Sequence, residues 1–135
     1  MSTEGPARIL VVDDDDDLRR IVCKELSAYG FRVDQANDGE EAIAKLQAEP
    51  VELITLDIKL PNVDGWGVLN FVKENHLTTR VVMLTAYGSV QSATRAQKMG
   101  ADAFLEKPYD MDELLFTIEG LLDNGGEALG RTSTP

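Results

Sequence analysis

The sequence predicts an α/β domain, a doubly wound parallel sheet of five strands with helices on both faces. Five short apolar runs alternate with longer segments of helical period, which is the pattern of repeated βα units. Right-handed crossovers between parallel strands place their helices on both faces of an open sheet. The length of 135 residues is sufficient for one domain with a buried core and too short for two ordinary ones.

The five strands are expected over 8–12, 31–36, 51–56, 80–85 and 103–106. The second run, FRVDQA, is less apolar than the others and alternates with polar residues, so we place it at an edge of the sheet. The fifth run, AFLE, is the shortest. Each run leads into a segment of helical period, which predicts one helix after every strand.

The first helix is expected to bury one apolar face and to end at a capping glycine, Gly30. The residues assigned to that face are Leu18, Ile21, Val22, Leu26 and Tyr29. Asn37 or Asp38 is expected to cap the second helix, which ends at Pro50. The inward residues of the second helix are Ala42, Ile43 and Leu46.

The last three helices follow the same pattern. The third passes through Trp66, Leu69 and Val72, and the fourth reaches Met99 before a second capping glycine, Gly100. The last helix carries apolar residues at helical spacing, which are Leu114, Leu115, Ile118, Leu121 and Leu122.

The composition changes at both ends of the chain. We expect a short extension over 1–7, one domain over 8–123, and a flexible tail or linker over 124–135, where Gly, Ser, Thr and Pro collect. No apolar run approaches the roughly 20 residues of a membrane span, and the N-terminal segment has no signal-peptide pattern. We therefore expect a cytoplasmic protein that does not associate with a membrane.

The net charge is −11, from 24 acidic and 13 basic residues. A nucleic-acid surface needs clustered lysines and arginines, whereas here Arg19 and the other basic residues are dispersed and are expected to be ordinary helix-face charges, with Lys107 as the exception. No direct binding to nucleic acid is expected. The single cysteine, Cys23, is assigned to packing, and His76 to an exposed position at the end of a helix.

Polar residues follow four of the five expected strands at the point where each ends. Asp13 and Asp14 follow the first, Asp57 the third, Thr85 closes the fourth, and Lys107 follows the fifth. In an open parallel sheet, ligands bind outside the carboxyl ends of the strands, near the point where strand order reverses. The sequence therefore predicts a site for a metal ion or a phosphate at this edge.

Three carboxylates in one place repel one another unless a cation offsets their charge. Their hard oxygen ligands suit Mg²⁺, whereas the chain has no Cys/His cluster for zinc. An aspartate beside Mg²⁺ can also attack a phosphoryl group, which makes Asp57 a candidate nucleophile. Lys107 would pair with one phosphoryl oxygen and the hydroxyl of Thr85 would bond another.

The aspartates at 15–17 need a different explanation. They lie where the first helix should begin, and acids there bond free N–H groups and complement the helix dipole. We assign Asp16 and Asp17 to this structural role, and for Asp15 the structural and metal roles both remain open.

Four segments together resemble the receiver domain of bacterial two-component response regulators. They are ILVVDDD, LITLDIKLPNVDGWGVL, VVMLTAYGS and AFLEKPYD, in this order and spread over 8–122. The resemblance implies a flavodoxin-like fold with strand order 2-1-3-4-5. It also implies a signalling phosphoacceptor that catalyses only its own phosphorylation and dephosphorylation, rather than a conventional enzyme.

The same resemblance implies roles for individual residues. Asp57 is the phosphorylated residue, Asp14 a direct Mg²⁺ ligand, Asp13 a ligand mostly through water, and the backbone carbonyl of Lys59 a further ligand. Thr85 and Lys107 contact the phosphoryl group, and Pro108 makes a cis bond with the preceding lysine. Lys59 and Tyr87 flank the phosphate entrance, where the family varies.

Phe104 matches the aromatic switch residue of the family, and a core phenylalanine is the alternative for it. The resemblance implies a sensor histidine kinase or a phosphotransfer protein as phosphodonor. It implies an output domain or protein partner that reads the surface of the fourth helix, fifth strand and fifth helix. The resemblance also leaves a homodimer open.

Two other classes of protein are alternatives to a phosphoacceptor, an enzyme and a binding module. A Mg²⁺-dependent phosphatase or mutase resembling the haloacid dehalogenases would need an acid two residues after Asp57, where this chain has Lys59, and a cap domain. A phosphorylation-independent binding module would be favoured if Asp57, Lys107 or the acid pair were missing. Both a stand-alone regulator and the receiver of a longer chain fit the sequence.

Overall fold

The computed structural model describes residues 5–86 and 90–124 as a three-layer α/β structure. Five strands, all parallel, form one sheet in the order β2-β1-β3-β4-β5. The strands are β1 (Arg8–Val12), β2 (Arg32–Ala36), β3 (Leu53–Asp57), β4 (Arg80–Thr85) and β5 (Ala103–Glu106). The expected sheet and its order are confirmed, with β2 at an edge. β3 is displaced from the expected span, since it starts at Leu53 and includes Asp57.

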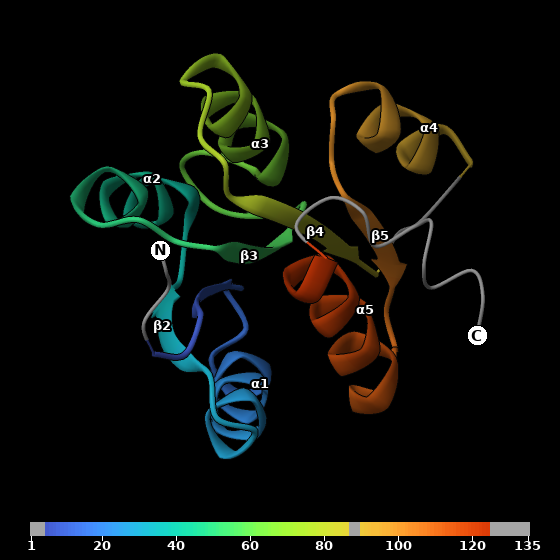
Figure 1. Ribbon diagram of the computed structural model, residues 1–135. Coiled ribbons are helices and arrows are strands. Elements are labelled where there is room, and N and C mark those ends of the chain that lie inside the picture. Colours follow the sequence, from blue (N-terminus) through green and yellow to red (C-terminus); the bar gives the residue numbers. More distant parts are fainter. Residues whose placement is uncertain (1–4, 87–89, 125–135) are drawn as a thin grey trace.

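Five helices cover the sheet, one after each strand. They are α1 (Asp16–Ala28), α2 (Gly39–Ala48), α3 (Gly65–Glu74), α4 (Val90–Lys98) and α5 (Met111–Asn124). Figure 1 shows α1 and α5 on one face of the sheet and α2, α3 and α4 on the other. No helix in the described part of the chain combines the length and apolarity needed to cross a membrane.

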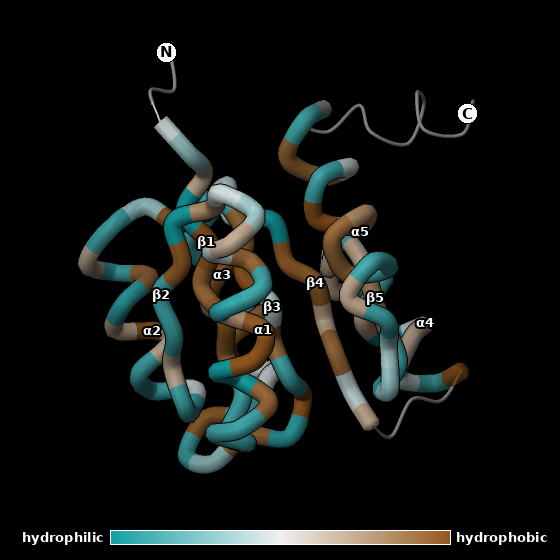
Figure 2. The backbone as a smooth tube through the Cα atoms, turned by 90° about the horizontal axis from the view of Figure 1, so that it is seen from below, coloured by the Kyte–Doolittle hydropathy of each residue, from teal (hydrophilic) through white to brown (hydrophobic). Residues whose placement is uncertain are grey.

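Each strand feeds both layers of the core, because successive side chains point to opposite faces. In β1, Leu10 and Val12 join the cluster beneath α2, α3 and α4, whereas Ile9 and Val11 join the cluster beneath α1 and α5. Figure 2 shows the hydrophobic residues concentrated along the central strands, while the helices alternate between hydrophobic and hydrophilic colours. The sheet is therefore packed between two apolar layers, one on each face, which fix the positions of its strand ends.

The helix ends follow the chemistry of the sequence. Asp38 precedes α2 and caps its N-terminus, because its side chain accepts a hydrogen bond from the Glu41 backbone N–H at 2.7 Å. The cap is therefore Asp38 rather than Asn37. Gly30 has a φ of 103°, the left-handed conformation that glycine adopts at a helix end without steric cost. The peptide bond between Lys107 and Pro108 is cis, as expected.

The predicted inward face of α1 was wrong at two positions. Ile21 is 54% exposed and Tyr29 is 53% exposed. With 3.6 residues per turn, Ile21 lies about 100° around the helix from Val22, outside the narrow strip that meets the sheet. Tyr29 is the residue after the last helical turn, and its ring stacks on Phe31 with centroids 6.1 Å apart.

Candidate functional site

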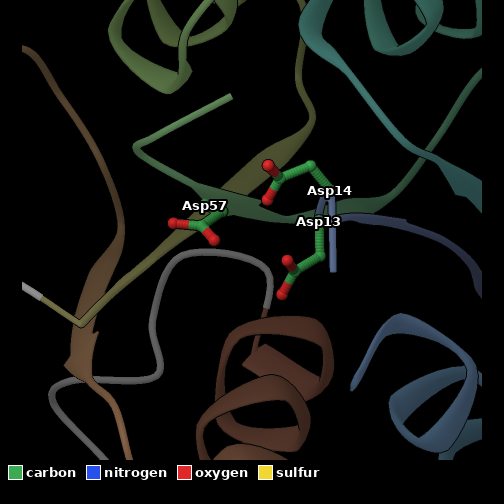
Figure 3. A group of neighbouring side chains, drawn as sticks. All are labelled: Asp13, Asp14 and Asp57. Atoms are coloured by element: carbon green, nitrogen blue, oxygen red, sulfur yellow. The ribbon is translucent and has the colours of Figure 1, made fainter. Parts of the chain in front are cut away.

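The polar residues expected at the strand ends come together at one edge of the sheet. Asp13 and Asp14 follow β1, and Asp57 is the last residue of β3, the neighbour of β1. Figure 3 shows the three side chains extending from these adjacent strand ends. One carboxylate oxygen from each lies within 4.8 Å of the others. The arrangement can hold a metal ion, because it offers three anionic oxygens to one point.

The three carboxylates differ in their exposure to solvent. Asp13 is 4% exposed and Asp57 is 7% exposed, whereas Asp14 is open to solvent. Two buried carboxylates side by side would be unstable without a cation, because each disfavours the ionised form of the other. The site therefore combines a buried pair with one accessible ligand.

Lys107 supplies the cation from the end of β5. Its Nζ lies 3.0 Å from Asp13 Oδ2 and 2.9 Å from Asp57 Oδ2, so one ammonium bridges the two buried carboxylates. The Lys107 backbone N–H donates to the Thr85 carbonyl at 2.8 Å, which ties the turn after β5 to the end of β4. The lysine is thus held by its backbone as well as its side chain.

Burial and charge act in different proportions on the two members of the pair. Burial raises the pKa of Asp57, while the hydrogen bond and charge of Lys107 lower it. The neighbouring Asp13 raises it again, and the net effect is a pKa above the ordinary value of 3.8. Burial lowers the pKa of Lys107, but its hydrogen bonds and charge interactions with Asp57 and Asp13 outweigh burial and raise the pKa above 10.5. One cation faces two carboxylates, so the lysine gains more from the cluster than Asp57 does.

The neighbouring aspartates begin α1. Asp15 caps the helix by accepting from the Leu18 backbone N–H at 3.1 Å, which confirms its structural role, and it also lines the hollow beside the cluster. Asp16 pairs with Arg19 at 2.8 Å and Asp17 with Arg20 at 3.6 Å. The run of five aspartates therefore divides into Asp13 and Asp14, which belong to the carboxylate cluster, and three residues at the start of the helix, of which Asp15 also lines the hollow beside the cluster.

The other predicted site residues lie at different distances from the cluster. The Lys59 backbone N–H is 3.4 Å from Asp57 Oδ1, and its side chain is exposed. Thr85 is buried at the end of β4. Phe104 lies in β5, half-buried against the core beneath α4, where it lines a separate hollow of about 270 Å³. Tyr87 lies outside the described residues.

A hollow of about 280 Å³ opens beside the cluster. Its lining consists of Asp13, Asp14, Asp15, Asp57, Lys59, Ala86 and Lys107. A second hollow of about 490 Å³ adjoins it on the side of α3, where Asp14 and Lys59 are joined by Trp66. Because carboxylates and an ammonium both line the smaller hollow, it can accommodate a metal ion together with a small anion.

One residue near the site was misassigned from the sequence. Arg19 was expected to be an ordinary helix-face charge, but it is 8% exposed and its Nη1 donates to the Asp13 carbonyl at 2.9 Å. The signal was present in the spacing, since Arg19, Val22 and Leu26 recur on the buried face of α1.

The model of the response regulator receiver domain matches residues 9–119. The chain belongs to this family. Receiver domains are signalling components of two-component systems rather than conventional enzymes, and the matched segment contains the whole acidic cluster and Lys107. The resemblance inferred from the four sequence segments is confirmed.

Solved receiver structures have the same fold. The CheY-like receiver domain protein of Methanospirillum hungatei JF-1 is 31% identical, with a TM-score of 0.86 over 91% of this chain and 98% of that one. The receiver domain of NtrX from Brucella abortus is 36% identical, with a TM-score of 0.80 over 86% of this chain and 98% of that one. CheY in the CheX-CheY-BeF3-Mg+2 complex of Borrelia burgdorferi is similar, with 30% identity and a TM-score of 0.83 over 87% of this chain and 90% of that one.

Two curated relatives are regulatory proteins. This receiver is 39% identical to the transcriptional regulatory protein TrcR of Mycobacterium tuberculosis over 118 residues, covering 87% of this chain and 46% of that protein. It is 33% identical to the regulatory protein AtoC of Escherichia coli K12, covering 85% of this chain and 25% of that protein. The receiver thus spans half or less of the length of these relatives.

Proposed function

We propose that this receiver accepts a phosphoryl group on Asp57 with the help of Mg²⁺ and passes the change to an output domain or protein partner. The observation that carries the proposal is the position of Asp57, which lies 2.9 Å from the ammonium of Lys107 and within 4.8 Å of Asp13 and Asp14 through carboxylate oxygens. A nucleophile, a cation for the phosphoryl oxygens and a set of metal ligands are the parts that phosphoryl transfer to a carboxylate requires.

Mg²⁺ would be held by Asp13, Asp14, Asp57 and the backbone carbonyl of Lys59. The donor set fits this ion, because it consists of oxygens in a hollow with room for water, and Mg²⁺ usually keeps several waters when bound. When bound, Mg²⁺ neutralises charge that develops on the phosphoryl oxygens. The related CheY of Borrelia burgdorferi was solved in a complex with BeF3 and Mg+2, which favours the same ion here.

The transfer step uses three groups of this chain, which are a carboxylate, an ammonium and a hydroxyl. A carboxylate oxygen of Asp57 forms the new O–P bond while the N–P bond of a phosphohistidine breaks, and the leaving imidazole nitrogen takes up a proton from solvent. Lys107 would move from its carboxylate partners to a phosphoryl oxygen. The Thr85 hydroxyl would bond another oxygen, because Thr85 closes the adjacent strand β4. The phosphodonor would be a sensor histidine kinase or a phosphotransfer protein.

The signal would leave the site through the edge of the sheet formed by β5. Phosphorylation adds about −1.5 to −2 charge and three acceptor oxygens, which would draw Thr85 toward the phosphate and let the half-buried ring of Phe104 turn inward. The surface of α4, β5 and α5 would then bind an output domain, a protein partner or a second copy of the chain. We place the domain itself at 8–123, with 1–7 and 124–135 as an extension and a tail or linker.

Intact-protein mass spectrometry after incubation with a small acyl phosphate tests the proposal. We expect the wild-type chain to gain one phosphoryl group in the presence of Mg²⁺ and none when the metal is chelated. The Asp57→Asn variant should gain none under either condition. The Asp17→Asn variant is a matched control, because Asp17 is exposed, pairs with Arg20 and is not among the residues that line the hollow, and it should be phosphorylated like the wild type.

Two results would contradict the proposal. A mass gain that persists in Asp57→Asn would place the phosphoryl group elsewhere. No gain in the wild type, when amide chemical shifts show that Mg²⁺ is bound and mass spectra are taken within seconds of mixing, would indicate a receiver that signals without phosphorylation.

A further inference from the structure

Arg19 is a charged residue on the buried face of α1. Only 8% of it is exposed, although arginine is seldom buried without partners that compensate its charge. The proposed phosphoryl transfer does not use it, because Arg19 does not line the hollow beside the acidic cluster. Its burial therefore needs an explanation of its own.

Each of the three guanidinium nitrogens has a partner. Nε donates to Gln35 Oε1 at 2.7 Å, Nη1 donates to the backbone oxygen of Asp13 at 2.9 Å, and Nη2 lies 2.8 Å from Asp16 Oδ1. These partners belong to β2, to the turn after β1 and to the first turn of α1. A planar guanidinium with donors in a fixed fork holds three such groups in one orientation, which a single ammonium does not do.

Asp13 is held at every polar group. Its backbone N–H donates to the Ala36 carbonyl at 3.2 Å, Oδ1 accepts from the Asp15 backbone N–H at 2.9 Å, and Oδ2 lies 3.0 Å from Lys107 Nζ. The remaining group is the backbone oxygen, which Arg19 holds. That oxygen belongs to the peptide that joins Asp13 to Asp14, so its orientation also sets where the chain enters Asp14.

We propose that Arg19 is a positioning residue of the metal site, which orients the peptide between Asp13 and Asp14 so that both carboxylates meet Asp57. This inference rests on the proposed function, in which these carboxylates hold Mg²⁺. Groups that orient metal ligands without touching the metal commonly change its affinity by one to two orders of magnitude when they are removed.

A positioning role and a simple charge role predict opposite signs. A cation beside the acidic cluster repels a second cation, so loss of the Arg19 charge alone would tighten Mg²⁺ binding. Loss of the bond to the Asp13 carbonyl would instead let the turn move and would weaken binding. The direction of the change therefore separates the two roles.

The experiment is a Mg²⁺ titration at fixed ionic strength, followed by amide chemical shifts in NMR spectra that also verify the fold. We expect Arg19→Met to raise the Kd for Mg²⁺ about tenfold, and Arg19→Lys, which keeps the charge but not the fork, to change it in the same direction by less. Arg20→Met is the matched control, because Arg20 is the next residue of α1 and its exposed side chain pairs with Asp17. It should leave the Kd unchanged or slightly lower.

A third variant keeps the test decisive if Arg19→Met does not fold. Gln35→Ala removes an exposed side chain and leaves Arg19 in place without the partner of its Nε. We expect a weaker but measurable rise in the Kd. If folded Arg19→Met binds Mg²⁺ as tightly as the wild type or more tightly, or if Arg19→Lys and Gln35→Ala both match the wild type, the positioning role is wrong.

The design also distinguishes failure of this inference from failure of the proposed function. If neither the wild type nor Arg20→Met binds Mg²⁺, the proposed metal site is wrong and the role of Arg19 toward it falls with it. If both bind Mg²⁺ and the Arg19 variants bind it equally well, the site stands and only the positioning role is overturned.

Discussion

The guanidinium of Arg95 lies over the indole ring of Trp66, with its central carbon 4.2 Å from the ring centroid. The contact links α4 to the start of α3, two helices that are separated by the whole of β4. Trp66 also lines the hollow that contains Asp14 and Lys59. An aromatic ring beside the acidic site is therefore in contact with α4, which forms part of the proposed partner-binding surface.

Replacement of Arg95 by alanine should lower the free energy of unfolding by about 0.5–1 kcal/mol, the contribution of a cation–π pair that is partly exposed. Urea unfolding followed by circular dichroism measures this change. Lys98→Ala is the control, because Lys98 is an exposed cation in the last turn of the same helix. An equal loss in both variants would show that the ring contact adds nothing to stability.

Asp57→Asn should stabilise the metal-free protein at neutral pH by roughly 0.5–2 kcal/mol, a common scale for single stabilising changes. The pKa of Asp57 is raised above 3.8 by burial and by Asp13, against the effect of Lys107, so the folded state favours the protonated carboxyl. That favourable contribution is fully present below pH 3.8 and is lost as the pH rises through the folded pKa. Asparagine does not ionise, so the Asp57→Asn variant does not lose this contribution to stability as the pH rises.

Thermal unfolding in the absence of divalent metal, measured from pH 3 to pH 8, tests this prediction. The gain of the variant should grow with pH between 3.8 and the folded pKa of Asp57 and then stay constant. Saturating Mg²⁺ should reduce or reverse it, because bound metal stabilises the wild-type site. A variant less stable than the metal-free wild type at pH 7 would show that Asp57 is stabilising in its ionised form.

Thr55→Val should stabilise the protein by about 1 kcal/mol, because the variant removes a buried hydroxyl that lacks a hydrogen bond. Thr55 lies in the centre of β3 and is 0% exposed, and its Oγ1 has no partner among the described residues. Its neighbours in register are Val11 and Val82, which suit a valine. Chemical unfolding of the two proteins measures the difference.

Thr79→Val provides the matched control for this change. Thr79 is also buried, but its hydroxyl donates to the Val51 carbonyl at 2.8 Å, so the same substitution should destabilise by about 1 kcal/mol. Opposite signs at the two threonines are the expected result. A loss of stability at both would mean that the Thr55 hydroxyl has a partner such as an ordered water.

Gly65→Ala should destabilise by about 3 kcal/mol, at the upper end of ordinary overpacking. A Cβ at Gly65 would lie 2.3 Å from the Asp57 backbone oxygen and 2.7 Å from Ile58 Cα, so either α3 or the end of β3 must move. Backbone atoms do not yield as a side chain can. The variant should therefore also perturb the amide signals of Asp57 and Ile58.

Gly120→Ala is the corresponding change in open space. A Cβ there meets nothing within 4 Å, and Gly120 lies inside α5, so alanine should stabilise the helix by about 0.5–1 kcal/mol. Thermal unfolding of the two variants should show shifts of opposite sign. A tolerated Gly65→Ala would mean that α3 can move away from β3 at little cost.

The sequence predicted which polar residues gather at the sheet edge, because the carboxyl ends of parallel strands lie at the same edge. Once the strands are located, the residues that follow them must gather at one edge, and this rule brought Asp13, Asp57 and Lys107 together across almost the whole chain. The strand order itself came from the family resemblance, since alternation of strands and helices does not determine which strands are neighbours.

The helix faces were predicted less reliably, because a helical period indicates which residues share a face but not how wide the buried strip is. Ile21 was placed inward on apolarity alone and lies outside that strip, while Arg19 was placed outward on charge alone and lies within it. The contact between Trp66 and Arg95 could not be predicted from the sequence for a related reason. It depends on how two helices pack against each other, and the residue spacing within one helix carries no information about that packing.

The bond between Lys107 and Asp13 joins residues that are 94 positions apart. Translation reaches Asp13 early and Lys107 only after five strands and four helices have been made. A ribosome-bound chain can pack its first strands and still lack the Lys107 ammonium, which offsets the negative charge of the buried Asp13 and Asp57. The lysine therefore makes assembly of the cluster dependent on completion of the sheet, because its ammonium reaches Asp13 and Asp57 only from the end of the last strand.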